Sequence, residues 1–395
     1  MHNFIFSIPT TAYFGKGQIK VLGETIKAHG GSKVLLAYGG GSIKQNGIYE
    51  ETIEQLDQAG LAHVELSGIQ PNPRIESVEE GIRIYHENNC DFILAVGGGS
   101  TLDACKAIAA GVKYTGPVKD LFVDASGISS KITAAASLAT ILTMAGTGSE
   151  LDMGGVITVG EDHKKMVILH PLLNPKFSIL DPEYTYTVPE HQTMAGVADI
   201  LCHLMEQYFT PAVGADVQDR MNEGVMKAVL ENAPKLLVDS RDYDARANIM
   251  WASSMALAGF QFVLGKPGFP FPLHGMGHEL SSRYDMTHGV TLALLTPSWM
   301  RHTIRTAPQH LPVFAQFARN VMGVSEKNDA IAAEAGIKAL EAFYAVIKMP
   351  ANLREAGVKE EDLEVMAEKA VENGNLGILT SIGKEEALQI MRMAF

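Results

Sequence analysis

Two apolar runs of strand length, each ending in the same glycine-rich turn, constrain the fold of this chain most. Lys33–Tyr38 ends in Gly39-Gly40-Gly41-Ser42, and Asp91–Val96 ends in Gly97-Gly98-Gly99-Ser100. Both runs are short and apolar and stop at glycine, which is typical of buried strands. Helical patterns alternate with them, and strands that alternate with helices pair in parallel. The N-terminal half is therefore predicted to be an α/β domain with a Rossmann-like parallel sheet.

The pattern changes after Asp181-Pro182. Further strands are predicted before that point, at Ala139–Met144, Gly155–Gly160 and Phe177–Asp181, whereas no convincing strand follows Pro189. Helical apolar patterns recur instead at His191–Phe209, Gln218–Leu237, Ala245–Leu264, Ala330–Ile347, Glu360–Asn373 and Lys384–Phe395. A chain of 395 residues is too long for one compact core. We expect an α/β domain at residues 1–184 and an all-helical domain at residues 185–395, with ligands in a cleft between them.

Charge and cysteine content exclude several classes of protein. The net charge of -13 argues against nucleic acid or an anionic membrane surface as the main partner. Cys90, Cys105 and Cys202 are far apart and form no Cys-x-x-Cys motif, so neither a disulfide framework nor a thiolate metal cage is expected. The sequence shows no signal peptide and no stretch of about 18 apolar residues. We expect a cytoplasmic protein with a small-molecule substrate.

The glycine turns predict a site for a phosphate-bearing cofactor. Glycine lets the backbone approach a pyrophosphate, and the N-terminus of the following helix favours negative charge. Ser100 and Asp103 are candidates to cap that helix. Tight strand-to-helix connections would explain the glycines equally simply, although two such turns in one half favour the binding interpretation. Neither turn matches Gly-x-Gly-x-x-Gly in its usual context, and the absence of a Gly-x4-Gly-Lys-[Ser/Thr] motif disfavours a nucleoside triphosphatase.

A third small and polar stretch, residues 143–150 with the sequence Thr-Met-Ala-Gly-Thr-Gly-Ser-Glu, follows a predicted strand. Its hydroxyls and amides suit a contact with phosphate or nicotinamide, and they suit a capped helix start just as well. The sequence alone leaves both interpretations open.

An aspartate and several histidines recur at helical spacing in the second half. Asp199 and His203 are four residues apart, as are His274 and His278, and His288 follows ten residues later. One carboxylate and three imidazoles can hold a divalent first-row metal. Each pair could instead be hydrogen-bonded core histidines, and the spacing does not decide between His274 and His278 as a ligand. Cys202 points in a different helical direction from His203 and is expected to be a small buried residue.

These motifs together resemble the iron-containing (group III) alcohol dehydrogenases, in particular their butanol dehydrogenase and broad-specificity aldehyde reductase branch. The resemblance extends from Phe14-Gly15-x-Gly17 to the C-terminal helices. It includes Gly98-Gly99-Ser100-x-x-Asp103, the 145–150 stretch, Leu180-Asp181-Pro182 and the Asp/His pattern. It implies a dinucleotide-binding α/β domain followed by a helical metal domain, in the architecture shared with dehydroquinate synthase.

The resemblance also implies roles for individual residues. The metal ligands would be Asp199, His203, His274 and His288, and His278 would be the nearby catalytic residue that is not a ligand. Cofactor contacts would come from the two glycine turns and from polar residues on other elements: Gly39, Gly40, Gly41, Ser42, Asn72, Gly98, Gly99, Ser100, Asp103, Thr143, Thr147 and Lys165.

The predicted activity is hydride transfer between a nicotinamide cofactor and short primary alcohols or their aldehydes, assisted by Fe²⁺ or Zn²⁺. NADP(H) is the expected cofactor, with NAD(H) possible, because relatives carry Asp where this chain has Gly40 and no acidic residue lies between Gly39 and Gly47. A homodimer is expected. Two alternatives stay open: a metal- and NAD-dependent lyase of the dehydroquinate synthase type, and a non-catalytic nucleotide-binding relative.

Overall fold

A computed structural model describes residues 1–160, 164–211, 214–258, 262–266, 271–377 and 379–395 of the chain. Contacts between residues divide it into two compact units. The α/β unit contains Ser7–Val188 and Leu257–Gly259, and the helical unit contains Met1–Phe6, Pro189–Ala256 and Phe260–Phe395. Each unit has its own arrangement of elements, and each is described in turn.

The α/β unit is built on six parallel strands in the order β1-β8-β5-β4-β2-β3. The predictions for β2 (Lys33–Tyr38), β4 (Phe92–Gly97), β5 (Ser137–Leu142) and β8 (Phe177–Leu180) are confirmed to within two residues. Two strands were not predicted, β1 (Thr11–Phe14) and β3 (Ala62–Leu66). They lie at the two edges of the sheet and are partly exposed, so neither has the continuous apolar run that marks the central strands.

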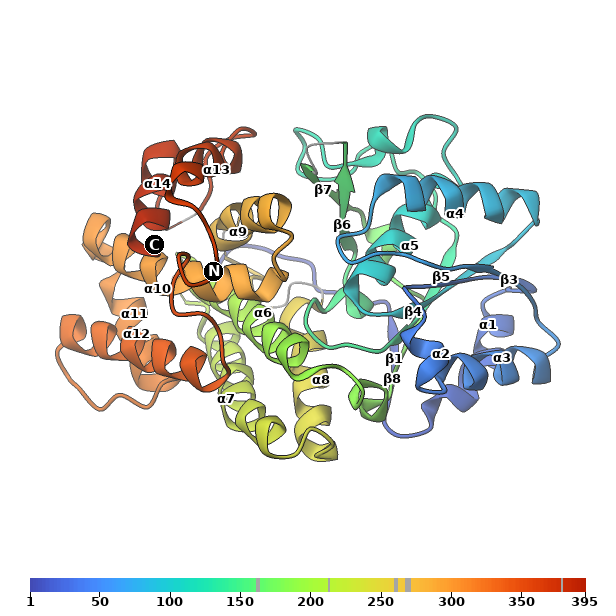
Figure 1. The fold of residues 1–395 in the computed structure, drawn as a ribbon, viewed down its shortest axis with the longest axis horizontal. Helices are drawn as coiled ribbons and strands as arrows, with labels where there is room; N and C mark the ends of the chain where they lie inside the picture. Colours follow the sequence, from blue (N-terminus) through green and yellow to red (C-terminus); the bar gives the residue numbers. More distant parts are fainter. Residues whose placement is uncertain (161–163, 212–213, 259–261, 267–270, 378) are drawn as a thin grey trace. The chain divides into compact units, whose positions relative to one another are not determined.

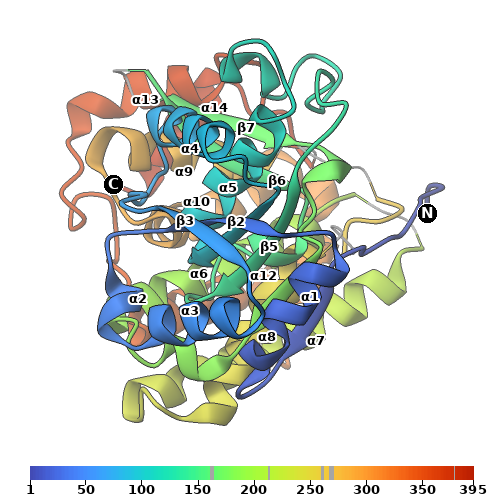
Figure 2. The same cartoon turned by 90° about the vertical axis from the view of Figure 1, so that its right-hand side faces the viewer.

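Both faces of the sheet are covered by helices, as the apolar central strands require. Helices α1 (Leu22–Ala28), α2 (Ser42–Gln45) and α3 (Ile48–Gln58) lie on one face, and α4 (Ile75–Glu87) and α5 (Gly99–Gly111) lie on the other (Figures 1 and 2). Alternate strand residues such as Leu36 and Leu94 pack with Leu22, Ile26 and Leu56 in one buried core cluster. The predicted parallel α/β fold is therefore confirmed.

A two-stranded antiparallel sheet stands apart from the parallel one. The strand predicted at Gly155–Gly160 is β6 (Gly154–Val159), and it pairs with β7 (Lys164–Leu169), which the sequence did not predict. The hairpin is anchored near the residues after β3, because Thr158 donates its backbone N–H to the carbonyl of Pro73 at 2.7 Å. Its anchoring brings β7 to the loop that carries Asn72.

The helical unit contains nine named α-helices in its described part: α6 (Glu190–Tyr208), α7 (Asp216–Val238), α8 (Tyr243–Leu257), α9 (Pro272–Tyr284), α10 (His288–Thr306), α11 (Leu311–Asn320), α12 (Asp329–Val346), α13 (Leu363–Ala370) and α14 (Lys384–Met393). Helices were predicted at α6, α7, α8, α12, α13 and α14, although residues 259–261 of the predicted Ala245–Leu264 helix lie outside the described residues. Between 189 and 395 the described residues contain one isolated β-bridge, Leu376 with Ile382, and no strand. Among the described residues, the longest apolar helices fall short of what a membrane span requires.

Helix α6 is the buried centre of this unit, and it packs closely against α10. Gly289, the second residue of α10, makes the close approach possible. A Cβ at this position would lie 1.8 Å from the backbone oxygen of Ala195, so only glycine fits there. Ala195 precedes Asp199 by one turn of α6, and His288 precedes Gly289. The crossing of the two helices therefore brings Asp199 and His288 together.

Candidate metal centre and dinucleotide-binding turns

Three helices of the helical unit place an oxygen and several nitrogens around one point. Asp199 and His203 lie one turn apart on α6, His274 lies in the first turn of α9, and His288 begins α10. Oδ1 of Asp199 lies 3.5 Å from Nδ1 of His203, 3.7 Å from Nε2 of His274 and 4.0 Å from Nε2 of His288. Ligand atoms of a tetrahedral metal with bonds of about 2.1 Å are about 3.4 Å apart, so these separations are close to those of a ligand set.

Three buried atoms of this cluster lack hydrogen-bond partners in the part of the chain that the structure describes. Oδ1 of Asp199, Nδ1 of His203 and Nε2 of His274 are buried and have no hydrogen-bond partner among the described residues. Buried polar atoms are otherwise almost always paired, so the cluster fits a bound cation that would satisfy them. Asp199, His274 and His288 each offer a ligand atom within 4.8 Å of the others. His203 lies beside this group, with its ring stacked on that of His274 at a centroid distance of 4.4 Å.

The electrostatics of Asp199 and His203 favour the protonation states that metal ligands need. Burial opposes ionisation of Asp199, but the field of His203 and the contacts with His274 and His288 outweigh it and hold the pKa of the carboxyl well below its usual range. Burial lowers the pKa of His203 to about 3, so its imidazole is neutral near pH 7. An anionic carboxylate next to a neutral imidazole is what cation binding requires.

Glu206, which was not predicted from the sequence, lies behind His274. Its Oε1 accepts the backbone N–H of Leu273 at 2.6 Å, and its Oε2 is hydrogen-bonded to Nδ1 of His274. Because a carboxylate can only accept, the proton of this contact lies on Nδ1, and Nε2 faces Asp199. Burial works against a charged His274, but Glu206 raises the pKa of this imidazole well above its ordinary value. Glu206 thus orients the ring through the nitrogen remote from the cluster.

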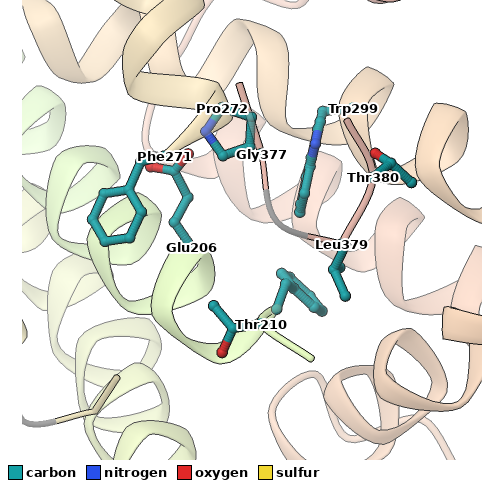
Figure 3. Close-up of a pocket in the computed structure, with 9 residues that line it drawn as sticks. Glu206, Thr210, Phe271, Pro272, Trp299, Gly377, Leu379 and Thr380 are labelled. Carbon is teal, nitrogen blue, oxygen red and sulfur yellow. The ribbon is translucent and has the colours of Figure 1, made fainter. Parts of the chain in front are cut away.

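Glu206 also lines a small pocket of the helical unit (Figure 3). Its lining is mostly apolar and includes Phe209, Phe271, Trp299 and Leu379. The close-up shows the Glu206 side chain next to Phe271 and Pro272. Glu206 as a whole residue is only 3 % exposed, and this burial strengthens the interaction of its carboxylate with His274.

His278 and Cys202 take different places from the ligand atoms. The His278 ring lies 6.3 Å from His274 and stacks on His288 at 5.2 Å, and it does not belong to the group that could share a cation. Cys202 is fully buried, with its Sγ 3.7 Å from Oε2 of Glu206. Burial raises the pKa of the Cys202 thiol, so it stays protonated and is a poor ligand.

In the α/β unit, the turn after β4 presents bare backbone at the start of α5. The N-cap of α5 is Gly98 and no side chain caps the helix, so the prediction that Ser100 or Asp103 caps it is wrong. The physical reason is their position, because α5 begins at Gly99 and both residues lie inside it. A Cβ on Gly99 would come within 2.4 Å of Oγ1 of Thr147, which places the 145–150 stretch against this turn. Uncapped N–H groups at a helix N-terminus favour a phosphate.

Asp103 faces the interior of the unit. One of its carboxylate oxygens accepts the Ser149 hydroxyl at 2.7 Å, and the other accepts the Val156 N–H at 2.9 Å. The neighbouring Lys106 is fully buried and paired with Asp152. These bonds tie the 145–150 stretch and β6 to α5. Asp103 therefore stabilises the turn from the interior of the unit, and both of its carboxylate oxygens already accept hydrogen bonds from the protein.

The other predicted cofactor residues come from three further places. Nζ of Lys165, on β7, donates to Oδ1 of Asn72 at 2.5 Å, so two residues that are far apart in sequence meet. Thr143 follows β5 and donates its backbone N–H to Gly97 at 2.9 Å. At the turn after β2, Gly41 has a φ of 103°, which favours glycine, and a Cβ on Gly40 would have no protein atom within 4 Å. This turn leaves room for a ligand.

Glu65 is, after Glu206, the second residue of the candidate sites that was not predicted from the sequence. It lies on β3 and accepts hydrogen bonds from the phenols of Tyr38 and Tyr49, the latter at 2.6 Å. Lys44, on α2, donates to it at 3.4 Å. No acidic residue occurs between 39 and 47, but the parallel pairing of β2 with β3 brings Glu65 to the turn.

Comparison with known proteins identifies the family. The family model described as iron-containing alcohol dehydrogenase matches residues 9–182, and that of the Fe-containing alcohol dehydrogenase family, C-terminal, matches residues 193–395. The chain is 45% identical over 399 residues to NADH-dependent butanol dehydrogenase A of Clostridium acetobutylicum, with 100% of both chains covered. It is 34% identical to the NADPH-dependent aldehyde reductase YqhD of Escherichia coli, with 99% of this chain and 97% of the reductase covered.

Solved structures agree with the sequence relatives. The crystal structure of NADH-dependent butanol dehydrogenase A from Thermotoga maritima has a TM-score of 0.93 and 33% identity, and it covers 100% of this chain and 99% of its own. The crystal structure of E. coli YqhD also has a TM-score of 0.93, with 34% identity and the same coverage. The family models together span both units, and the relatives match over their full length. The chain is therefore an oxidoreductase that belongs to the iron-containing alcohol dehydrogenase family.

Proposed function

We propose that this protein transfers hydride between NAD(P)(H) and short primary alcohols or aldehydes of the butanol type, with a divalent metal at Asp199, His203, His274 and His288. The observation that carries the proposal is the buried cluster around Oδ1 of Asp199, in which this oxygen, Nδ1 of His203 and Nε2 of His274 have no hydrogen-bond partner among the described residues. The relatives named as butanol dehydrogenase and aldehyde reductase support the substrate class.

A metal at this site would supply Lewis acidity toward the substrate oxygen, and a nicotinamide would supply or take up the hydride. The protein's own residues prepare the site. Asp199 supplies negative charge, and Glu206 fixes the ring of His274. His278, beside the cluster and not in it, is placed to exchange the proton that a carbonyl gains or an alcohol loses. The N-terminus of α5 would hold the pyrophosphate with backbone N–H groups.

NADPH is proposed as the preferred cofactor. Ser42 and Lys44 follow the turn after β2, where a 2′-phosphate would be recognised, and no acidic residue stands between Gly39 and Gly47 to accept a ribose 2′-hydroxyl. Gly40 has open space around its Cβ position and no positive φ, so Gly40→Asp is sterically allowed. This substitution should move the preference toward NADH, measured as the ratio of kcat/KM for the two cofactors. A ratio that does not change would contradict the placement of the 2′-phosphate at this turn.

The metal is proposed to be Fe²⁺ or Zn²⁺. Three imidazoles and one carboxylate suit either ion, and by the Irving–Williams order Zn²⁺ should bind more tightly than Fe²⁺. Purified protein is therefore expected to contain zinc or a mixture, whichever metal is used in the cell. Elemental analysis of protein produced in media with added iron or zinc measures this directly.

The proposed activity is tested by following nicotinamide absorbance with NADPH or NADH and a panel of short aldehydes. Stoichiometric conversion of cofactor and aldehyde into oxidised cofactor and alcohol is the expected result. A lyase of the dehydroquinate synthase type would only cycle its cofactor, so no net oxidation of added NADPH would favour that alternative. Binding of cofactor with no turnover of any aldehyde or alcohol would favour a non-catalytic role.

A further inference from the structure

Four side chains form a charged and aromatic cluster beside the turn after β2. Glu65 accepts hydrogen bonds from the Tyr38 and Tyr49 hydroxyls. Lys44 lies 3.4 Å from Glu65, and its Nζ sits over both aromatic rings, 5.0 Å from the Tyr38 centroid and 4.4 Å from the Tyr49 centroid. We define these four residues as the Glu65 cluster. Its charges cancel, because one carboxylate faces one ammonium group.

The position of the Glu65 cluster relates it to the cofactor. Strand β2 pairs in parallel with β4, whose glycine turn begins α5, so the carboxyl ends of the two strands are neighbours. In dinucleotide-binding folds the strand next to the pyrophosphate turn ends at the adenosine ribose, where a carboxylate accepts the 2′-hydroxyl or a cation accepts the 2′-phosphate. Lys44 would be the cation here, and Glu65 lies beside it on β3.

We propose that Glu65 determines nucleotide specificity by acting as a counter-charge to Lys44, which weakens the binding of the 2′-phosphate and lets NADH compete. The proposal rests on the proposed use of NAD(P)(H) by this enzyme. The turn after β2 contains no acidic residue, so the negative charge that influences cofactor choice would come from Glu65 on β3. Glu65 acts through Lys44 and through its own charge, and it does not need to touch the nucleotide.

The contacts of Glu65 favour this role over direct binding of the ribose. Both carboxylate oxygens already accept hydrogen bonds within the cluster, Oε1 from Tyr49 and Oε2 from Tyr38 and Lys44. Burial alone would raise the pKa of Glu65, but the two phenols and Lys44 outweigh it and lower the pKa, so the group is a carboxylate near pH 7. It therefore carries a full negative charge close to the only cation between residues 39 and 47.

The size of the effect follows from Coulomb's law in a solvated site. The Glu65 side chain is 34% exposed and the Lys44 side chain is 44% exposed, so water and salt screen their charges. Removing the negative charge next to Lys44, which would bind a phosphate of charge about −2, should then tighten binding by about threefold to tenfold. A ligand without the 2′-phosphate should be affected far less.

The test uses Glu65→Gln in the full-length enzyme. Glutamine can keep the shape of the cluster, because its amide oxygen accepts from one phenol and its NH2 group donates to the other. Glu80→Gln is the matched control, since Glu80 is an exposed carboxylate paired with Arg83 on α4, on the other face of the sheet. Binding of 2′,5′-ADP and of 5′-AMP is measured by titration calorimetry, together with kcat/KM for NADPH and NADH.

The proposal predicts that Glu65→Gln binds 2′,5′-ADP about threefold to tenfold more tightly, with 5′-AMP unchanged and the kcat/KM ratio shifted toward NADPH by a similar factor. Glu80→Gln should match the wild type. Unchanged 2′,5′-ADP binding in Glu65→Gln would overturn the proposal, and so would weaker binding of 5′-AMP and NADH, which would make Glu65 a ribose ligand. A wild-type enzyme that binds none of these nucleotides would instead refute the proposed cofactor use.

Discussion

The two histidines at positions 274 and 278 show how neighbouring residues of one type acquire different tasks. Both lie on α9, one turn apart, and their spacing in the sequence does not distinguish them. In the structure, His274 has one nitrogen bonded to Glu206 and the other facing Asp199 at 3.7 Å. The His278 ring stacks on His288 instead. A second carboxylate, Glu206, therefore marks His274 as the candidate ligand.

Replacing each histidine by alanine should separate binding from catalysis. His274→Ala removes a proposed ligand and should lose metal and activity together. His278→Ala should keep most of its metal and lose rate by about 10²–10⁴, with an altered pH profile, because a proton relay is missing. Metal content per chain and kcat are measured for both variants. Loss of metal in His278→Ala, with metal retained in His274→Ala, would reverse the assignment.

Glu206→Gln should weaken metal binding while the protein stays folded. Glutamine cannot accept from both the Leu273 N–H and the His274 Nδ1–H as the carboxylate does, so the orientation of His274 is lost. Loss of such a supporting partner typically costs about 10–100-fold in metal affinity. Competition with a coloured chelator measures that affinity. Glu223→Gln is the control, since Glu223 is a buried glutamate that binds Tyr208 and Asn320 away from the cluster, and equal effects in both variants would argue against the role of Glu206.

At the scale of elements, the crossing of α6 and α10 determines the geometry of the candidate metal centre. The helices meet where Gly289 touches the backbone of Ala195. Gly289 follows His288 directly, and Ala195 lies one helical turn before Asp199. No side chain fits between the helices at that point. A longer distance between them would separate the donor atoms on α6 from the donor atom on α10.

Gly289→Ala should therefore damage both stability and metal binding. A Cβ at 1.8 Å from a backbone oxygen forces the helices apart, and overpacking of this kind typically costs about 1–3 kcal/mol. Gly224→Ala is the matched control, because Gly224 lies in α7 with no atom within 4 Å of its Cβ position and should be neutral or slightly stabilising. Thermal unfolding and metal content are measured for both. Equal behaviour of the two variants would show that the helix crossing tolerates a side chain.

The junction of α5 with β6 should make stability depend on pH through Asp103. Burial raises the pKa of Asp103 to about 6, although Lys106 and Ser149 oppose the shift. The folded state then binds this proton more tightly than the unfolded state, whose carboxyl titrates near 3.9, so this contribution to stability is present below pH 4 and is lost as the pH rises through 6.

Asp103→Asn should remove that pH dependence. Asparagine can accept from the Val156 N–H and donate to the Ser149 hydroxyl, so the hydrogen bonds persist without a charge. The variant should gain on the order of 1–2 kcal/mol relative to the wild type between pH 5 and pH 7. Unfolding midpoints of both proteins across this range measure the gain. A constant difference would contradict the raised pKa.

The sequence predicted those features that a local pattern can express. The runs ending at Tyr38 and Val96 gave the central strands, and the four-residue spacing of Asp199 and His203 placed both on one helix. Glu206 and Glu65 escaped because their partners are distant in sequence, His274 being 68 residues from Glu206 and Tyr38 being 27 residues from Glu65. Helices α9 and α10 were not among the helices predicted, since Gly275, Gly277 and Pro297 interrupt their apolar pattern.

At the scale of the whole molecule, the two units carry complementary halves of the proposed chemistry. The helical unit holds the donor cluster for a cation, and the α/β unit holds the glycine turns for a dinucleotide. Neither half suffices for hydride exchange with a carbonyl carbon, because the reaction needs both a hydride carrier and a polarised oxygen. Turnover should therefore require metal as strictly as it requires nicotinamide.

The most direct measurement is the rate of NADPH oxidation with butanal as metal is removed and returned. Protein treated with a chelator, and shown by elemental analysis to contain no metal, should have no activity. Activity should return in proportion to added Fe²⁺ or Zn²⁺ and level off at one ion per chain. Full turnover by verified metal-free protein would contradict the central claim.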